Sequence, residues 1–299
     1  MSQITISDLQ AEWANNLDCI DIELIIAHFL GKERSFIIAH PDHILPLKET
    51  TDITRALHAR VNDIPLAYIT GVKEFFGRDF IVTKDTLIPR PETELIITDI
   101  IQCKNTIPTQ TRIVDIGTGS GAIIITLAKE LADVKDHIFF IASDISPEAL
   151  LIAHKNAIHH CVDTRINFFH SDLLSYPQLR DSLSYPHPTK IIFTANLPYV
   201  DEKIKKELLQ KKESRSLMHE PQIALWSSDH GLHHYQLLID QIFSLKKILP
   251  QTSCEIYCEI SPEQKEMFFI FLESYHVASD HIFIINDLMQ RPRIIRFTL

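Results

Sequence analysis

The amino-acid sequence predicts an α/β fold with a doubly wound, mostly parallel sheet, preceded by a small helical domain. From Thr111 onward, strand-like and helix-like runs alternate along the chain, which is the pattern of βαβ units. Three of the 7 glycines fall between residues 117 and 121, directly after the first of these strands. Before about residue 70, apolar residues recur at helical spacing instead.

The first 72 residues are expected to form the helical domain. Ser7 is the predicted cap of its first helix, Asp18 or Asp21 opens the second, and Gly31 stops it. Two further helices are predicted over residues 35–39 and 48–61. This domain carries no recognisable chemistry, so we assign it to recognition of a substrate or partner, or to packing.

Residues 73–86 are expected to form a hairpin linker, because two short β-prone runs flank Gly77. The α/β domain is then assigned to residues 87–299. It begins with a helix entry over residues 87–94, in which Pro91 suits the first turn and the acidic residues favour the positive end of the helix dipole.

Seven strands are predicted for the α/β domain, and the last two lie close enough in sequence to form a hairpin at one edge. The strands span 112–116, 138–143, 166–170, 190–195, 254–260, 281–286 and 293–298, and the helices 122–131, 147–159, 231–248 and 262–275. The charged stretch 201–218 fits a solvated helix or a mobile loop that faces the substrate.

Composition excludes several classes of protein. The 299 residues carry a net charge of −10, which disfavours non-specific nucleic-acid binding. No apolar run approaches the ~20 residues of a membrane span, and the start lacks the basic region of a secretory signal. The five cysteines are scattered, so we expect reduced thiols in a cytoplasmic protein and no metal site. The paired histidines at 159–160 and 233–234 are expected on helix surfaces.

The glycine-rich stretch Asp115-Ile116-Gly117-Thr118-Gly119-Ser120-Gly121-Ala122 follows a strand and opens a helix. Glycines there allow the backbone to approach a ligand closely. Asp144, at the end of the next strand, stands where an acid accepts ribose hydroxyls. The stretch therefore indicates a nucleoside cofactor, but a dinucleotide fits the spacing of Gly117, Gly119 and Ala122 as well.

A second motif, Asn196-Leu197-Pro198-Tyr199, ends the fourth strand of the domain. The asparagine amide offers an acceptor and two donors, Pro198 stiffens the backbone, and Tyr199 adds a flat face with a polar tip. Together these groups are suited to hold a planar, nitrogen-bearing group by its edge and its face.

In this order, the motifs resemble those of class I S-adenosylmethionine-dependent methyltransferases, which have a Rossmann-like, seven-stranded sheet. The resemblance implies that Asp115 receives the amino-acid part of the cofactor, that Asp144 accepts the ribose hydroxyls and that Asp172 binds the adenine amino group. The remaining cofactor contacts are implied for Gly117, Thr118, Gly119, Ser120, Gly121, Ile145, Leu173 and Asn196. An Asn-Pro-Pro-Tyr-like motif is typical of enzymes that methylate planar nitrogens.

The resemblance narrows further to the peptide chain release factor glutamine methyltransferases, the HemK or PrmC family. It rests on a series of stretches in order: Pro65–Gly71, Glu74–Gly77, Leu87–Glu94, Asp115–Ala122, His219–Pro221 with Ala224–Leu225, Asp229–Leu232, and Asp287 with Arg293. A sister family modifies a glutamine of ribosomal protein uL3, but residues 91–94 favour the release-factor branch.

The resemblance implies transfer of a methyl group to N5 of the glutamine in the Gly-Gly-Gln motif of class 1 release factors, with Asn196, Leu197, Pro198 and Tyr199 as catalytic residues. Leu197 departs from the proline usual in the family. Alternatives are the uL3 substrate and a binding module with little turnover. A DNA adenine methyltransferase is disfavoured by the acidic charge, and a nicotinamide oxidoreductase does not explain residues 196–199.

Overall fold

The computed structural model describes residues 4–134 and 138–299, and the chain divides into two compact units. The helical unit comprises the residues up to Val72 together with Lys211–His219. The sheet unit comprises Lys73–Gln210 and Glu220–Leu299. Residues 1–3, at which the sequence predicts no secretory signal, lie outside the described residues.

The helical unit contains α1 (Ile6–Trp13), α2 (Cys19–Leu30), α3 (Arg34–Ala39), α4 (Leu47–Val61) and α5 (Leu66–Thr70). The prediction that Ser7 caps the first helix is wrong. Thr5 caps it, because its hydroxyl accepts from the Asp8 amide while the Asp8 carboxylate accepts from the Thr5 amide. The short helix α5 was not predicted.

The charged stretch after residue 200 forms α10 (Lys205–Gln210) and a 3₁₀ helix over Lys212–His219. The 3₁₀ helix belongs to the helical unit, and one ring nitrogen of His219, Nε2, lies 3.1 Å from the Asn62 carbonyl oxygen. The helical unit is therefore built from two segments that are far apart in sequence.

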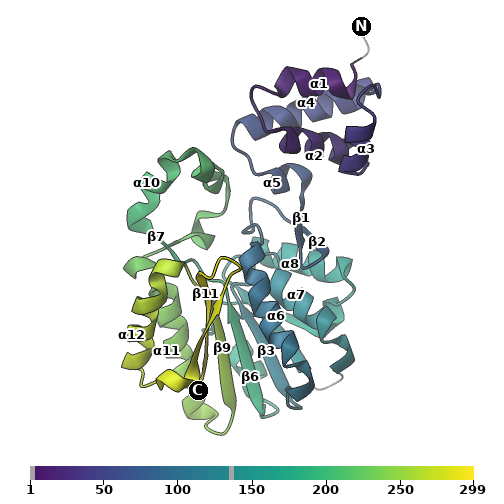
Figure 1. Cartoon of the computed structure of the whole chain (residues 1–299). Coiled ribbons are helices and arrows are strands. Elements are labelled where there is room, and N and C mark those ends of the chain that lie inside the picture. Colours follow the sequence, from purple (N-terminus) through teal and green to yellow (C-terminus); the bar gives the residue numbers. More distant parts are fainter. Residues whose placement is uncertain (1–3, 135–137) are drawn as a thin grey trace. The chain divides into compact units, whose positions relative to one another are not determined.

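The sheet unit contains a seven-stranded sheet of the predicted kind, with strand order β10-β11-β9-β6-β3-β4-β5 (Figure 1). Neighbours from β9 to β5 are parallel, whereas β11 is antiparallel to both β9 and β10. The strands are β3 (Thr111–Ile116), β4 (Ile138–Asp144), β5 (Ile166–His170), β6 (Lys190–Ala195), β9 (Ser253–Glu259), β10 (Ile282–Asn286) and β11 (Pro292–Thr298). The predicted edge hairpin is β10 and β11.

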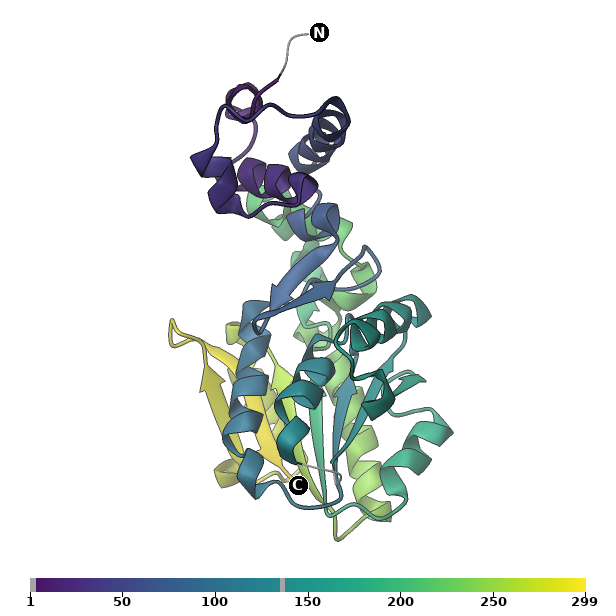
Figure 2. The same ribbon diagram turned by 90° about the vertical axis from the view of Figure 1, so that its right-hand side faces the viewer.

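Helices cover both faces of the sheet, because its strands are apolar on both sides. On one face are α6 (Glu94–Gln102), α7 (Ala122–Glu130) and α8 (Pro147–His159), with α6 and α7 side by side (Figure 2). On the other are α9 (Pro177–Ser184), which was not predicted, α11 (His233–Ile248) and α12 (Lys265–Ser274).

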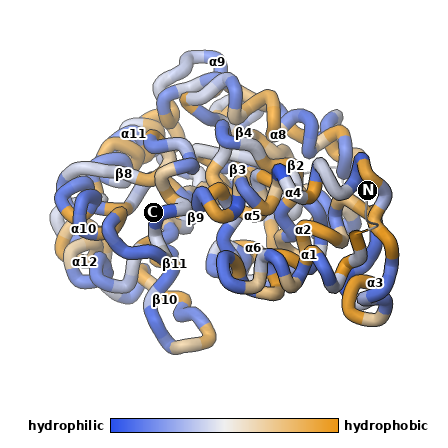
Figure 3. The backbone as a smooth tube through the Cα atoms, turned by 90° about the horizontal axis from the view of Figure 1, so that it is seen from above, coloured by the Kyte–Doolittle hydropathy of each residue, from blue (hydrophilic) through white to orange (hydrophobic). Residues whose placement is uncertain are grey.

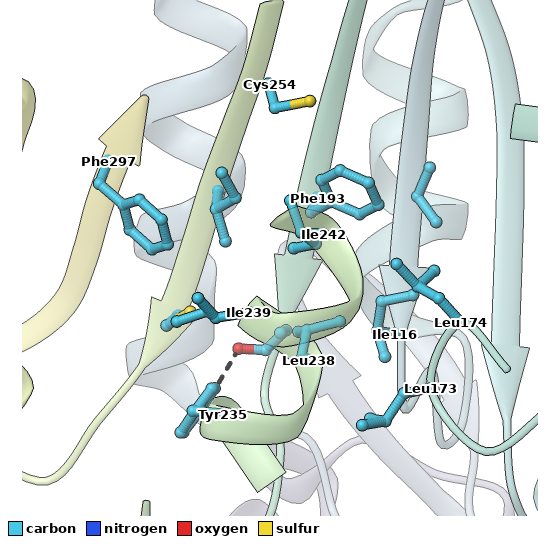
Figure 4. Packing of buried hydrophobic residues seen from close by; sticks show 14 of the residues in the cluster. Ile116, Leu173, Leu174, Phe193, Tyr235, Leu238, Ile239, Ile242, Cys254 and Phe297 are labelled. Atoms are coloured by element: carbon cyan, nitrogen blue, oxygen red, sulfur yellow. Dashed lines mark hydrogen bonds between the residues drawn. The ribbon is translucent and has the colours of Figure 1, made fainter. Parts of the chain in front are cut away.

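Alternation along each strand decides which side chains meet which helices. On β6, Phe193 faces α11, and Figure 4 shows Leu238, Ile239 and Ile242 of that helix on the same side of the strands. Ile192 packs instead with the cluster that contains α6 and α7. Along the helices in Figure 3, hydrophilic (blue) and hydrophobic (orange) stretches follow one another at short intervals, as expected of amphipathic helices.

The predicted linker hairpin is β1 (Val72–Phe75) and β2 (Arg78–Ile81). Two short segments, β7 (Val200–Asp201) and β8 (Trp226–Ser227), pair in parallel beyond the end of β6. Among the described residues, no helix combines the length and the hydrophobicity that crossing a membrane requires.

Candidate active site at the carboxyl end of the sheet

The order of the strands creates a binding position at the carboxyl ends of β3 and β6. The chain proceeds from β3 to β4 and β5 on one side and then returns to β6 and β9 on the other. Ligands of open α/β sheets bind at such a switch point. Within the sheet unit, a cavity of about 320 Å³ opens there, with residues 117–120 on the β3 side and 196–198 on the β6 side.

The glycine-rich loop brings its backbone to the wall of this cavity. Gly117 has φ +68°, and a Cβ atom there would lie 2.9 Å from Cδ2 of Leu197. A side chain at position 117 would therefore push Leu197 out of place. The amides of Gly117 and Thr118 donate to the Ser143 carbonyl at 2.8 and 2.9 Å, which ties the loop to the end of β4.

Asp144 ends β4 and lies on the cavity wall. Its Oδ2 accepts from the Gly119 amide at 2.8 Å and its Oδ1 from the Ser146 amide at 2.9 Å. Burial nevertheless raises the pKa of this carboxyl. Because an ionised carboxylate has about four acceptor sites, Asp144 can still accept hydroxyl hydrogen bonds from a ligand.

Other predicted cofactor residues also line the cavity, namely Thr118, Ser120, Ile145, Asp172 and Leu173. Ile145 follows β4 and is 46% exposed. Asp172 and Leu173 follow β5, beyond Ser171, whose amide donates to the Asp144 carbonyl at 3.0 Å. The structure thus brings the ends of β3, β4 and β5 to one cavity, as the sequence predicts.

On the other side of the switch point, Asn196, Leu197 and Pro198 line the same cavity. Nδ2 of Asn196 donates to the Thr93 hydroxyl at 3.1 Å. The Leu197 amide donates to the hydroxyl of Tyr235 on α11 at 3.3 Å. The Asn-Leu-Pro segment is therefore held from both faces of the sheet.

The structure does not place Asp115 on the cavity wall, so a direct contact between Asp115 and the cofactor stays a prediction. Asp115 is 1% exposed. Its Oδ2 accepts from the Thr118 hydroxyl at 2.6 Å and its Oδ1 from the Thr194 hydroxyl at 2.8 Å. Side chains alternate between the two faces of a strand. Asp115 is directly opposite Thr194 in the β3–β6 register, so both side chains lie on the same buried face of the sheet.

Gly121 and Tyr199 also lie outside the lining, and their contacts with the cofactor and the substrate stay predictions. Gly121 caps α7 and packs where an added Cβ would lie 3.3 Å from Ala153. The Tyr199 hydroxyl donates to Oε1 of Glu259 at 3.2 Å, so its polar tip is directed at a buried carboxylate. Burial, with the neighbouring Glu259 charge, raises the pKa of Tyr199.

Sequence reasoning missed several residues of the wall. They come from the stretch that precedes α6 (Thr86, Leu87, Pro89, Thr93), from the loop before β8 (Pro221, Ile223, Ala224) and from the start of α11 (His233, His234, Leu237). The two histidines were expected on a helix surface. The stretch before α6 was predicted as a helix entry and the loop before β8 as part of the resemblance, and neither was given a position in the site.

A buried carboxylate joins two of these missed stretches. Glu220 is 4% exposed, and it accepts from the Ile88 amide at 3.1 Å and from Nη2 of Arg90 at 2.7 Å. Since Glu220 directly precedes Pro221, this contact holds both loops at the cavity. The sequence signal was weak: Arg90 and Glu220 carry opposite charges, and each directly precedes a proline.

The charges of the cavity distinguish between the two cofactors that the glycine spacing allows. Its lining contains the carboxylates of Asp85, Asp144 and Asp172, and no Lys or Arg among the described residues. The amides of residues 117–119 are already donated to protein oxygens. A pyrophosphate would find neither cations nor these amides, whereas a cationic cofactor with ribose hydroxyls, such as S-adenosylmethionine, fits this wall.

Residues 14–71 match the PrmC N-terminal domain family, and residues 107–245 match a methyltransferase domain family. A release factor glutamine methyltransferase of Nitratidesulfovibrio vulgaris is 37% identical over 220 residues, covering 74% of this chain and 69% of the relative. One of Koribacter versatilis is 34% identical, covering 75% and 74%.

A bifunctional methyltransferase of Rickettsia bellii is 29% identical over 94% of this chain, but the match spans only 51% of that relative. Among solved structures, the hMettl16 catalytic domain in complex with a 3′UTR hairpin shares the fold, with a TM-score of 0.55 at 14% identity over 86% of this chain and 84% of that one. The identities to the release factor enzymes show that the chain belongs to the release factor glutamine methyltransferase family.

Proposed function

We propose that the protein transfers a methyl group from S-adenosylmethionine to N5 of the glutamine in the Gly-Gly-Gln motif of class 1 peptide chain release factors. The observation that carries this proposal is the composition of one cavity. In a member of this family, the acidic wall that suits a cationic cofactor also contains the Asn196 amide and the Leu197-Pro198 backbone.

On the cofactor side, Asp144 would hold the ribose hydroxyls, and Asp172 with Leu173 would hold the adenine. The loop 117–120 would bound the amino-acid end, with Asp115 acting behind it by fixing the Thr118 hydroxyl. S-adenosylmethionine supplies, when bound, a methyl group activated by a sulfonium. The described residues of the cavity are assigned binding and alignment of this group.

On the substrate side, the glutamine amide nitrogen is a poor nucleophile because its lone pair is delocalised into the carbonyl. The Asn196 side-chain oxygen and the Leu197 carbonyl would accept its two N–H bonds, which fixes the nitrogen and favours positive charge developing on it. Alignment of this kind contributes up to ~7–11 kcal/mol to a reaction between two bound groups. Tyr199 would pack near the amide plane, and the proton leaves to solvent after transfer.

The helical unit would recognise the body of the release factor. Three apolar side chains of this unit, Ile38, Ile44 and Leu47, are 57%, 47% and 70% exposed, and they lie within ten residues of one another in sequence. Exposed apolar side chains mark a protein-binding surface where they form one patch, and we assign this stretch to such a surface. At a net charge of −10, the chain is unsuited to direct contact with nucleic acid.

The test is to incubate the protein with S-adenosylmethionine and a class 1 release factor and to read the Gly-Gly-Gln peptide by fragmentation mass spectrometry. We expect one added methyl on the glutamine, and none with Asn196→Ala. A glutamine that stays unmodified, while the cofactor is shown to bind, would contradict the proposal. A uL3-type protein incubated in parallel would then show whether the enzyme acts on a different glutamine or lacks methyltransferase activity.

A further inference from the structure

A buried carboxylate lies behind the substrate side of the cavity without lining it. Glu259 ends β9 and is 1% exposed. In the β6–β9 register the last pair is Ala195 with Cys258, so Asn196 and Glu259 are the next residue on each strand. The register therefore brings Glu259 beside the residue that is expected to hold the substrate.

Glu259 reaches Asn196 through one intermediate side chain. The hydroxyl of Thr93 donates to Oε2 of Glu259 at 2.6 Å, and Nδ2 of Asn196 lies 3.1 Å from the same hydroxyl oxygen. Thr93 is only 4% exposed, so water has little access to the hydroxyl. The other carboxylate oxygen of Glu259 accepts from Tyr199.

The chemistry of these groups fixes the direction of each hydrogen bond. An ionised carboxylate only accepts, and a threonine hydroxyl has a single proton. Thr93 donates that proton to Glu259, so its oxygen can only accept from Asn196. The NH₂ group of Asn196 must then face Thr93, which leaves its carbonyl oxygen on the opposite side of the planar amide.

We propose that Glu259 and Thr93 are positioning residues that orient the Asn196 amide with its oxygen, rather than its NH₂ group, toward the substrate. The inference rests on the proposed function. It explains why the site prefers a substrate nitrogen that carries N–H bonds, since the Asn196 oxygen can only accept. With the amide rotated by 180°, an NH₂ group would confront the N–H bonds of the incoming glutamine, and neither side would accept.

The orientation can be measured without any substrate. In the full chain, with ¹³C-labelled threonine methyl groups and ¹⁵N-labelled asparagine, we expect a nuclear Overhauser contact between the Thr93 methyl and the Asn196 NH₂ protons. Assigned spectra in which this contact is absent, so that the carbonyl faces Thr93, would overturn the inference. This readout does not depend on which protein the enzyme methylates.

The kinetic test compares Thr93→Val, which keeps the shape of the side chain but removes the hydroxyl, with Thr93→Ser, which keeps it. We expect Thr93→Val to lower kcat at least tenfold, with KM for the release factor and Kd for S-adenosylmethionine within threefold of wild type. Thr93→Ser should restore at least a third of the turnover. A role in packing alone would give the opposite order, because Thr93→Val keeps the side-chain volume whereas Thr93→Ser removes a methyl group.

The outcomes separate this inference from the proposed function. Equal turnover of wild type and Thr93→Val on the release factor would refute the positioning role and leave the function intact. A release factor that no variant modifies, together with the expected Overhauser contact, would refute the function and keep the orientation of Asn196.

Discussion

Asp115 and Glu259 lie on either side of β6, on the same face of the sheet, and each is buried and accepts two hydroxyl hydrogen bonds. Burial raises the pKa of both to about 7. They differ in what their partners touch. Through Thr118, Asp115 supports the glycine-rich loop, whereas Glu259 supports Asn196 through Thr93.

The comparison shows that the same local chemistry can serve opposite halves of one site. Each buried carboxylate fixes the position of a threonine hydroxyl, and that threonine in turn belongs to or contacts a residue of the cavity wall. Variants of the two carboxylates and of Asn196 therefore separate the cofactor half of the site from the substrate half.

The largest effect is expected for Asn196→Ala, which removes the acceptor on the substrate half. Loss of one hydrogen bond to developing charge typically costs about 10²–10³-fold in turnover, and we expect a decrease of that size. Binding of S-adenosylmethionine, measured by calorimetry, should change by less than about fivefold, since the cofactor half is untouched. Turnover that stays near wild type would exclude the assigned role.

A smaller and opposite pair of effects is expected for the two carboxylates. Glu259→Gln should lower kcat about tenfold and leave the Kd for S-adenosylmethionine nearly unchanged. Asp115→Asn should mainly raise that Kd, because the amide keeps only one acceptor oxygen for the Thr118 and Thr194 hydroxyls, which loosens the loop. Single-turnover kinetics and equilibrium binding distinguish these cases, and identical profiles for the two variants would remove the proposed division of labour.

The pH dependence of turnover should report Glu259. Burial raises the pKa of Glu259 to about 7, and the negative charge of Glu92 adds to the rise. The hydrogen bonds from Thr93 and Tyr199 and the positive charge of Arg293 oppose it. Below this pH a protonated Glu259 can donate to Thr93, which frees Thr93 to donate to the Asn196 oxygen. We therefore expect kcat to fall as the pH decreases from 8 to 6.

The control for this profile is Glu259→Gln, which should show low turnover with little pH dependence over that range. Asp115→Asn should keep the wild-type shape. If Asp115→Asn flattens the profile and Glu259→Gln does not, the titrating group belongs to the cofactor half.

The two carboxylates should contribute alike to the pH dependence of the free energy of unfolding. Each has a folded-state pKa near 7, above its ordinary value near 4, so the folded state binds the proton more tightly. This stabilisation is complete below about pH 4 and is lost as the pH rises through 7. Replacing either residue by its amide should remove roughly 1 kcal/mol per pH unit from the slope between pH 5 and 6.5. Urea unfolding at several pH values measures it, and an unchanged slope in either variant would show that its pKa is not raised.

The smallest effect is expected for Leu197→Pro, which restores the residue usual in the family. The substitution removes the 3.3 Å hydrogen bond from the Leu197 amide to the Tyr235 hydroxyl, but it keeps the backbone carbonyl assigned to the substrate. Turnover should stay within about threefold of wild type. A wild type without activity that the proline restores would instead mark this chain as a binding protein.

The sequence by itself determined the architecture and the location of the site. Alternating runs predicted all seven strands of the main sheet, and two motifs at strand ends predicted where the cavity lies. These signals are local, because strand and helix periodicity and glycine-rich turns follow from neighbouring residues. The short helices α5 and α9 were missed, since segments of five and eight residues carry little periodic signal.

Only the tertiary structure decided which side chains reach the cavity. The motif placed Asp115 at a strand end, but its register partner Thr194, 79 residues away, holds it inside the sheet unit. Glu259 and Thr93 are 166 residues apart and meet only when β9 forms beside β6. Strand order and register are set by long-range packing. They bring Glu259, which belongs to no recognised sequence motif, to Thr93 and thereby to Asn196.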